Sequence, residues 1–161
     1  MEEGEQRFFL PEGSEFPTAI NERISFMNKR TYIEQHQGIS EEIETIQSLL
    51  DENNLEKNAD QIALHICTLA GKISVHLSLE DKFMYPKLAE SKEEQTQRLA
   101  IRYQQQMGGI AEMFALYKDK YNMRQKILDH RYEIKTETHK IFHEIRNRIF
   151  KEESELYMYI L

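Results

Sequence analysis

A histidine and a glutamate in the stretch HLSLEDKFMYPKL have the spacing needed for chemistry, because His76 and Glu80 are four positions apart. On a helix, this spacing projects both side chains from one face towards one point. An imidazole and a carboxylate placed in this way form half of a metal site. A metal ion needs further ligands, so the rest of the chain must supply them.

Composition limits the classes of partner. The chain has 161 residues, enough for one domain, and its formal net charge of -7 argues against a nucleic acid held by its phosphates. The N-terminal sequence lacks the basic start of a signal peptide, and no apolar run approaches the length of a membrane span. The single cysteine, Cys67, excludes a disulfide framework and is interpreted as a small core residue. We therefore expect a cytoplasmic protein that binds neither nucleic acid nor membrane.

Four segments show the apolar spacing of amphipathic helices. The second has the longest stripe: Ile62, Ile66, Leu69, Ile73, His76, Glu80, Phe83 and Lys87. The stripes of the others are Ile33, His36, Ile43 and Leu50; Ala100, Met107, Phe114 and Tyr121; and Ile134, Ile141, Ile145, Arg148, Glu152 and Leu156. Short breaks at 51–54, near Ser91 and near Asn122 favour antiparallel neighbours. The sequence predicts an all-α, up-down-up-down antiparallel four-helix bundle over 18–161, with helices near 18–53, 57–90, 93–121 and 124–158, after an N-terminal arm at 1–17.

The two halves of the chain can be laid on each other as an internal repeat. YIEQHQGI at 32–39 matches YQQQMGGI at 103–110 with a shift of 71, and HLSLEDKFMY at 76–85 matches RIFKEESELY at 148–157 with a shift of 72. The overlay pairs Glu80 with Glu152, His36 with Met107, and His76 with Arg148. Every paired position lies on the inward stripe of its helix. We therefore expect all six side chains at one level of the core.

A histidine on the first helix and HxxxE on the second, followed by an aromatic-proline close, resemble the hemerythrin-like (HHE cation-binding) family. This resemblance implies a four-helix bundle that holds two irons through histidines and carboxylates. Carried over by position, it implies that His36, His76, Glu80 and Glu152 are metal ligands. Met107 and Arg148 occupy the positions of two further expected histidines.

The two replacements change the chemistry expected at this site. A thioether is a poor ligand for ferric iron, and a guanidinium stays protonated and cannot ligate. An inward Arg148 could instead neutralise the buried carboxylates of Glu80 and Glu152. The pattern favours a metal centre replaced by an internal salt bridge, with no cofactor. A single-metal site on His36, His76, Glu80 and Glu152, and a two-metal iron centre, are the alternatives.

Three functions are consistent with this pattern. The first is a non-enzymatic, regulatory or protein-binding bundle with a degenerate metal centre, acting as a monomer or homodimer on an unidentified protein partner. The second is an iron protein that senses or carries O2, NO or iron. The third comes from a looser resemblance of HLSLEDKF and RIFKEESEL to the Rsd/AlgQ regulators, which bind the housekeeping sigma factor of RNA polymerase. His139 and His143 fall off the inward stripe and are interpreted as surface residues, while Gly108-Gly109 interrupts the third helical pattern without a phosphate-loop context.

Overall fold

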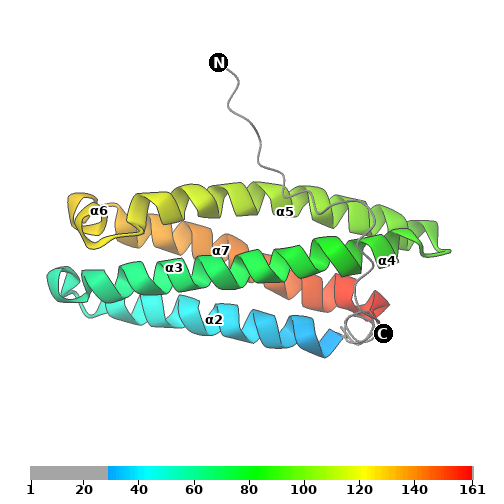
Figure 1. Cartoon of the computed structure of the whole chain (residues 1–161), viewed down its shortest axis with the longest axis horizontal. Helices are drawn as coiled ribbons and strands as arrows, with labels where there is room; N and C mark the ends of the chain where they lie inside the picture. The colour runs from blue at the N-terminus through cyan, green and yellow to red at the C-terminus, as the bar shows by residue number, and fades with distance from the viewer. Residues whose placement is uncertain (1–28, 161) are drawn as a thin grey trace, which may run out of the picture.

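The computed structural model describes residues 29–160, and these are helical apart from short connections (Figure 1). Within this part of the chain no strand is present, so the all-α class is confirmed. The elements are α2 (Lys29–Asp51), α3 (Leu55–Leu79), η1 (Glu80–Met84), α4 (Tyr85–Ala89), α5 (Glu94–Tyr121), α6 (Arg124–Asp129), α7 (Ile134–Lys151), η2 (Glu152–Leu156) and η3 (Tyr157–Tyr159). The predicted arm at 1–17 and the start of the helix predicted at 18–53 lie outside the described residues.

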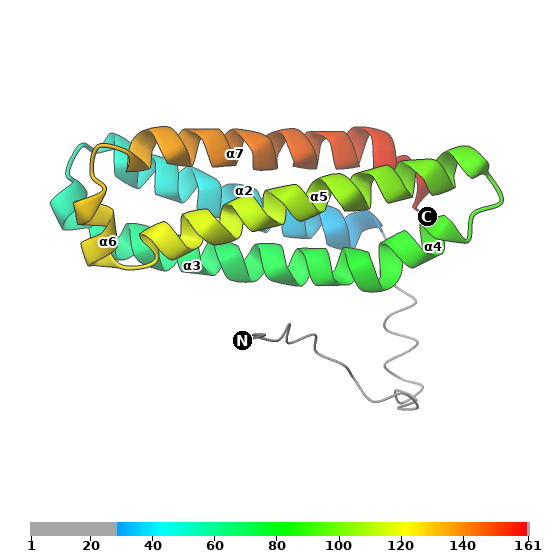
Figure 2. The same cartoon turned by 90° about the horizontal axis from the view of Figure 1, so that it is seen from above.

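The long helices α2, α3, α5 and α7 lie side by side along the long axis of the molecule (Figures 1 and 2). Helix α2 packs against α3 and α7, and α5 packs against the same two helices. Helix α6 lies at the end where α2 passes into α3, whereas α4 and the C-terminus lie at the opposite end. Each long helix thereby contributes one side to a shared core.

The breaks between helices fall where they were predicted, with one exception. The turn after α2 uses Asn53 in the left-handed conformation (φ 52°), and Asn54 caps α3 through a hydrogen bond from the backbone N of Lys57. The helix predicted at 124–158 is instead interrupted between α6 and α7. There His130 ends α6, since its backbone N–H and its ring both bond the carbonyl of Lys126, at 3.2 and 2.9 Å.

Two π-helical segments, η1 and η2, begin at the buried glutamates Glu80 and Glu152. Each adds a residue to the helical turn and rotates the residues that follow. The buried side chains are therefore Met84 at the end of η1 and Tyr85 and Leu88 after it. The predicted continuation of the stripe through Phe83 and Lys87 is wrong, because Phe83 is only half-buried and Lys87 is exposed. The two segments occupy equivalent positions in the repeat, which supports the overlay with a shift of 72.

The core consists of two apolar clusters with a polar layer between them. One cluster is aliphatic and includes Ile43, Ile66 and Ile141, while the other is rich in tyrosine and includes Tyr32 and Tyr103. The buried polar side chains between them are His36, His76, Glu80, Arg148 and Glu152.

Helix α3 differs from the other helices on its outer face. Its continuation over Leu55–Ala89 is long and apolar enough to span a membrane by length and composition alone, with a mean hydropathy of 1.4 in its most apolar window. This corrects the expectation that no apolar run reaches that length, although core helices of soluble proteins pass the same test. Leu64 and Val75 are 63% and 58% exposed on this helix. Cys67, predicted in the core, is also exposed, because Ile66 and Leu69 take the inward positions beside it.

Candidate metal centre

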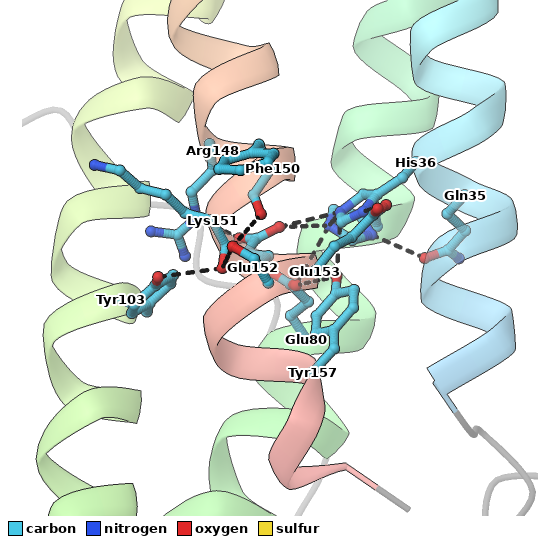
Figure 3. Close-up of polar contacts among 12 residues, drawn as sticks. Gln35, His36, Glu80, Tyr103, Arg148, Phe150, Lys151, Glu152, Glu153 and Tyr157 are labelled. Carbon is cyan, nitrogen blue, oxygen red and sulfur yellow. Dashed lines mark hydrogen bonds and ion pairs between the residues drawn. The ribbon is translucent and has the colours of Figure 1, made fainter.

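The polar layer brings together side chains that the sequence placed at one level of the core, and Figure 3 shows four of them, His36, Glu80, Arg148 and Glu152. His36 comes from α2, His76 from α3 and Arg148 from α7, while Glu80 and Glu152 open the two π-helical segments. None of these five side chains belongs to a residue that is more than 4% exposed. Met107 is half-buried on α5 and lines the same small cavity as His36 and Arg148. The predicted convergence of all six positions is confirmed.

Three of these residues present donor atoms that could hold one metal ion. The ligand atoms of His36, His76 and Glu152 all lie within 4.8 Å of one another. His36 Nε2 is 3.2 Å from His76 Nε2 and 3.1 Å from Glu152 Oε2, and Glu80 Oε1 is 3.3 Å from His76 Nε2. Metal–ligand bonds of about 2.0–2.2 Å place neighbouring ligands about 3 Å apart. The donor set therefore already has the spacing of a coordination shell.

Both imidazoles are held from outside by acceptors on their Nδ1 atoms. His36 Nδ1 lies 2.8 Å from the carboxylate of Glu153, and His76 Nδ1 lies 3.0 Å from the amide oxygen of Gln35. A carboxylate and an amide oxygen accept hydrogen bonds, so each Nδ1 carries the hydrogen. Each Nε2 atom consequently points into the polar layer. This is the arrangement in which metal-ligating histidines are usually supported.

Protons alone do not satisfy all of the contacts at His36 Nε2. This one atom lies 3.1–3.2 Å from Glu152 Oε2, His76 Nε2 and the hydroxyl of Tyr157. An unprotonated Nε2 repels the Glu152 carboxylate, whereas a protonated one cannot accept from His76. A cation placed among these donors would satisfy all of the lone pairs together. The donor set therefore fits a metal ion of the kind that binds imidazole and carboxylate.

Arg148 forms the other half of the polar layer. Its Nε donates to Glu152 Oε1, its Nη2 donates to the hydroxyl of Tyr85 at 2.9 Å, and its guanidinium lies 4.4 Å from the ring centroid of Tyr103. Glu152 thus bridges a guanidinium on one oxygen and the histidine pair on the other. Among the described residues, Arg148 Nη1 and Glu80 Oε2 have no hydrogen-bond partner.

Burial and charge set the protonation of the layer. Burial alone would lower the pKa of His76, but hydrogen bonds and charges from Glu152 and Glu80 outweigh it and raise this pKa to about 9. Burial would raise the pKa of Glu152, yet its contacts with His36, His76 and Arg148 lower that pKa to about 2. Burial dominates at Glu80 and raises its pKa. The two carboxylates therefore differ, and Glu152 is the one held firmly as an anion.

The sequence interpretation missed a tyrosine in this layer. Tyr157 is not among the candidate site residues identified from the sequence, but its hydroxyl lies 3.1 Å from both His36 Nε2 and Glu80 Oε1. A signal was present, because the repeat pairs Tyr157 with Tyr85 and both tyrosines directly follow a π-helical segment. The outer partners Gln35 and Glu153 were also missed.

Other candidate positions lie away from this layer. His139 and His143 are exposed, as predicted, and the His143 ring bonds Asn147. Gly108 and Gly109 are exposed on α5, and a Cβ added to either would meet no described atom within 4 Å. Close helix approach does not explain this glycine pair.

Comparison with known families gives one match. The model of the hemerythrin HHE cation binding domain matches residues 29–160. No curated protein and no solved structure matched the chain. The match covers both halves of the polar layer.

Proposed function

Because the chain belongs to the hemerythrin HHE cation-binding family, we propose that it is a single-metal member of that family. His36, His76, Glu80 and Glu152 hold one iron ion, and Arg148 takes the place of a second. The proposal is carried by the outward hydrogen bonds of both Nδ1 atoms, which aim two Nε2 atoms at one point beside Glu152.

The residues around the ion have different roles. Glu153 and Gln35 orient the two imidazoles, and Glu152 joins the ion to Arg148 through its two oxygens. The guanidinium supplies a fixed positive charge, which repels a second divalent ion and balances the carboxylates. Bound iron would supply a Lewis-acidic, redox-active centre in a site closed to bulk water.

The role that follows is non-enzymatic and regulatory. The support is steric: the donor residues are at most 3% exposed, and the cavity beside them measures about 20 Å³. Such a space holds about one water-sized molecule, so no organic substrate reaches the ion. Binding of iron itself, or of a small gas such as O2 or NO, is the event that the site can report to a protein partner. The lone cysteine, which is unpaired, is consistent with a cytoplasmic location.

The proposed topology is an up-down-up-down antiparallel four-helix bundle formed by α2, α3, α5 and α7. It is supported by the short connections at 52–54 and 90–93, since short connections join antiparallel neighbours. In this topology, each half of the internal repeat is one helical hairpin.

A metal-free regulatory bundle is the second candidate, favoured by the charges in the polar layer. With its pKa near 9, His76 is cationic at neutral pH, so His76 and Arg148 together balance Glu80 and Glu152. In this state, Arg148 and the His76 imidazolium form the internal salt bridges in place of any metal.

Metal titration separates the two candidates. Metal-free protein is titrated with Fe(II) under anaerobic conditions, and with Zn(II) as a redox-inert control, while bound metal and melting temperature are measured. One ion per chain and a melting temperature that rises with metal concentration support the single-metal site. His36→Ala and His76→Ala should abolish both effects, whereas the matched exposed variants His139→Ala and His143→Ala should keep them. If the wild-type protein retains no metal and is not stabilised, the metal-free candidate replaces the first.

A further inference from the structure

Tyr157 lies within the donor set rather than beside it. Its hydroxyl is 3.1 Å from His36 Nε2 and 3.1 Å from Glu80 Oε1, which are the same separations that join the other donor atoms. The Tyr157 ring stacks on the His36 ring, with centroids 5.3 Å apart and planes 14° apart, and the residue is fully buried. Figure 3 shows Tyr157 pointing from the C-terminal end of the chain towards His36 and Glu80.

Tyr85, the equivalent of Tyr157 in the first half of the repeat, shows what a tyrosine hydroxyl at this position faces. Tyr85 follows η1 as Tyr157 follows η2, and its hydroxyl receives the guanidinium of Arg148 at 2.9 Å. Each tyrosine hydroxyl therefore points at the cation-binding position of the polar layer. For Tyr85 that cation is Arg148, and for Tyr157 it is the position between the two histidines.

We propose that Tyr157 is a direct ligand of the metal through its phenol oxygen, a proposal that rests on the single-metal function. When Fe(III) binds, the O–H bond of Tyr157 breaks, an oxygen–iron bond forms and the proton passes to the buffer, with no change in oxidation state. With Arg148 counted, Fe(III) and two glutamates leave the buried layer with two net positive charges, and the phenolate lowers this to one. Charge neutrality matters in a buried site, where an uncompensated charge is costly. A hard oxygen donor also suits ferric iron better than the thioether of Met107 on the opposite side.

The test is optical, because iron(III)-bound phenolate absorbs visible light by charge transfer. Metal-free protein is loaded with Fe(III) supplied as its nitrilotriacetate complex, and iron content and the visible spectrum are recorded together. Wild-type protein should show the band and resonance-enhanced phenolate vibrations. Tyr157→Phe should lose the band completely while retaining iron, and the matched variant Tyr85→Phe should keep both.

The outcomes separate the two proposals. Iron retained by wild-type protein without a band overturns the ligand role of Tyr157 and leaves the single-metal site standing. Failure to retain iron overturns the single-metal site itself. A band that persists in Tyr157→Phe assigns it to another tyrosine and also overturns the proposal. If Tyr157→Phe fails to fold, wild-type protein is labelled with ring-deuterated tyrosine, and a shift of the vibrations shows that a tyrosine binds the iron. Persistence of the signal in Tyr32→Phe and in Tyr85→Phe then assigns it to Tyr157.

A second inference concerns the outer face of α3 and is independent of the metal. Between Leu64 and Ser78 the exposed residues of α3 carry no charge: they are Leu64, Cys67, Thr68, Gly71, Ser74, Val75 and Ser78. This outer face of α3 is bounded by Asp60 at one end and Lys82 at the other, both exposed. A helix that is apolar on both sides normally has both sides covered.

The charges at the two ends indicate what covers this face. Gly71 lies midway between Asp60 and Lys82, eleven residues from each. A second copy packed antiparallel across Gly71 would place Asp60 of each chain beside Lys82 of the other and Leu64 beside the small side chain of Ser78. A Cβ added at Gly71 would meet no described atom within 4 Å, so the backbone there is open to close approach. We infer that the outer face of α3 forms an antiparallel, two-fold symmetric contact between two copies of this chain.

Sedimentation velocity over a concentration series tests the dimer in the full chain. Wild-type protein should form a dimer that Gly71→Gln abolishes. Asp60→Lys and Lys82→Asp should each weaken the dimer at least tenfold, and the double variant should restore it. Because Asp60 also pairs with Arg124 within the chain, at 2.9 Å, restoration by the double variant is the decisive result. The inference is overturned if the wild-type protein is monomeric at all concentrations, or if its dimer is unaffected by these changes. It is also overturned if the wild-type protein stays monomeric and floats with lipid vesicles.

Discussion

The two halves of the polar layer have the same backbone arrangement but differ in the source of their positive charge. In both halves a buried glutamate opens a π-helical segment and a buried tyrosine follows it. One turn before that glutamate, the first half has His76 and the second half has Arg148. Imidazole accepts a cation from solution, whereas guanidinium is itself a permanent cation. The backbone therefore fixes where a positive charge must lie. The residue one turn before the glutamate, His76 or Arg148, determines whether that charge comes from a metal or from the chain itself.

The two glutamates show the consequence of this asymmetry. Glu152 contacts Arg148 on one oxygen and His36 on the other, and its pKa is lowered to about 2. Glu80 contacts His76 and the hydroxyl of Tyr157 through its Oε1 and no guanidinium, its Oε2 has no partner among the described residues, and its pKa is raised. The carboxylate that lacks a guanidinium is therefore the one most in need of a metal.

Making the halves alike should produce the largest effect. Met107→His together with Arg148→His restores two imidazoles at positions that already line the shared cavity. We expect the number of bound Fe(II) or Zn(II) ions to rise from one to two per chain, because structural metal sites bind with free energies of about 10–16 kcal/mol. Elemental analysis after gel filtration measures the number. An unchanged count would show that the second half no longer has the geometry of a metal site.

Removing the guanidinium of Arg148 from the second half should lower the free energy of unfolding by nearly as much as a bound metal raises it at a moderate metal concentration. Arg148→Ala leaves Glu152 without its guanidinium partner in a buried setting, so the free energy of unfolding of the metal-free protein should fall by about 3–5 kcal/mol. Urea unfolding measures the loss. The matched control is Arg146→Ala, since Arg146 is exposed and bonds the side chain of Gln47. Equal stabilities for the two variants would mean that Arg148 does not neutralise the layer.

The π-helical segments that both halves share can be tested through the side chains that they rotate. Leu88 is 4% exposed, so Leu88→Ala should destabilise the protein by about 2–5 kcal/mol. Lys87→Ala, one residue earlier and exposed, should change stability by less than about 0.5 kcal/mol. An uninterrupted α-helix would reverse this order, so urea melts of the two variants report directly on the register after η1.

The sequence predicted the inward positions up to each π-helical segment and failed after the first of them. Steps of three and four residues identified His36, His76, Arg148 and Glu152 as buried, because an amphipathic helix has a fixed period. That period changes inside a π-helix, and no residue pattern in EDKFM indicates that a π-helix forms there. The outer partners Gln35 and Glu153 were missed for another reason: each is a polar residue next to a buried one, His36 or Glu152, and cannot be told from a solvated residue until the neighbouring helix is in place. Cys67 was misplaced because its neighbours are apolar on all sides of α3.

The smallest effect concerns pH, and it also separates the halves, since the first half has the imidazole of His76 where the second has a guanidinium that stays protonated. The pKa of His76 is raised from 6.5 to about 9 in the folded protein, so its imidazolium stabilises the fold fully below pH 6.5. That contribution is lost as the pH rises towards 9, and we expect the free energy of unfolding of the metal-free protein to fall by about 1–2 kcal/mol over this interval. His76→Gln should remove the dependence, while the distant exposed variant His139→Gln should keep it. Metal-loaded protein should behave in the opposite way, because protons compete with the ion for imidazole and binding strengthens as the pH rises. Urea melts at pH 6.5 and 9, with and without Zn(II), would therefore show lines of opposite slope if His76 accepts either a proton or a metal, and parallel lines if it accepts no metal.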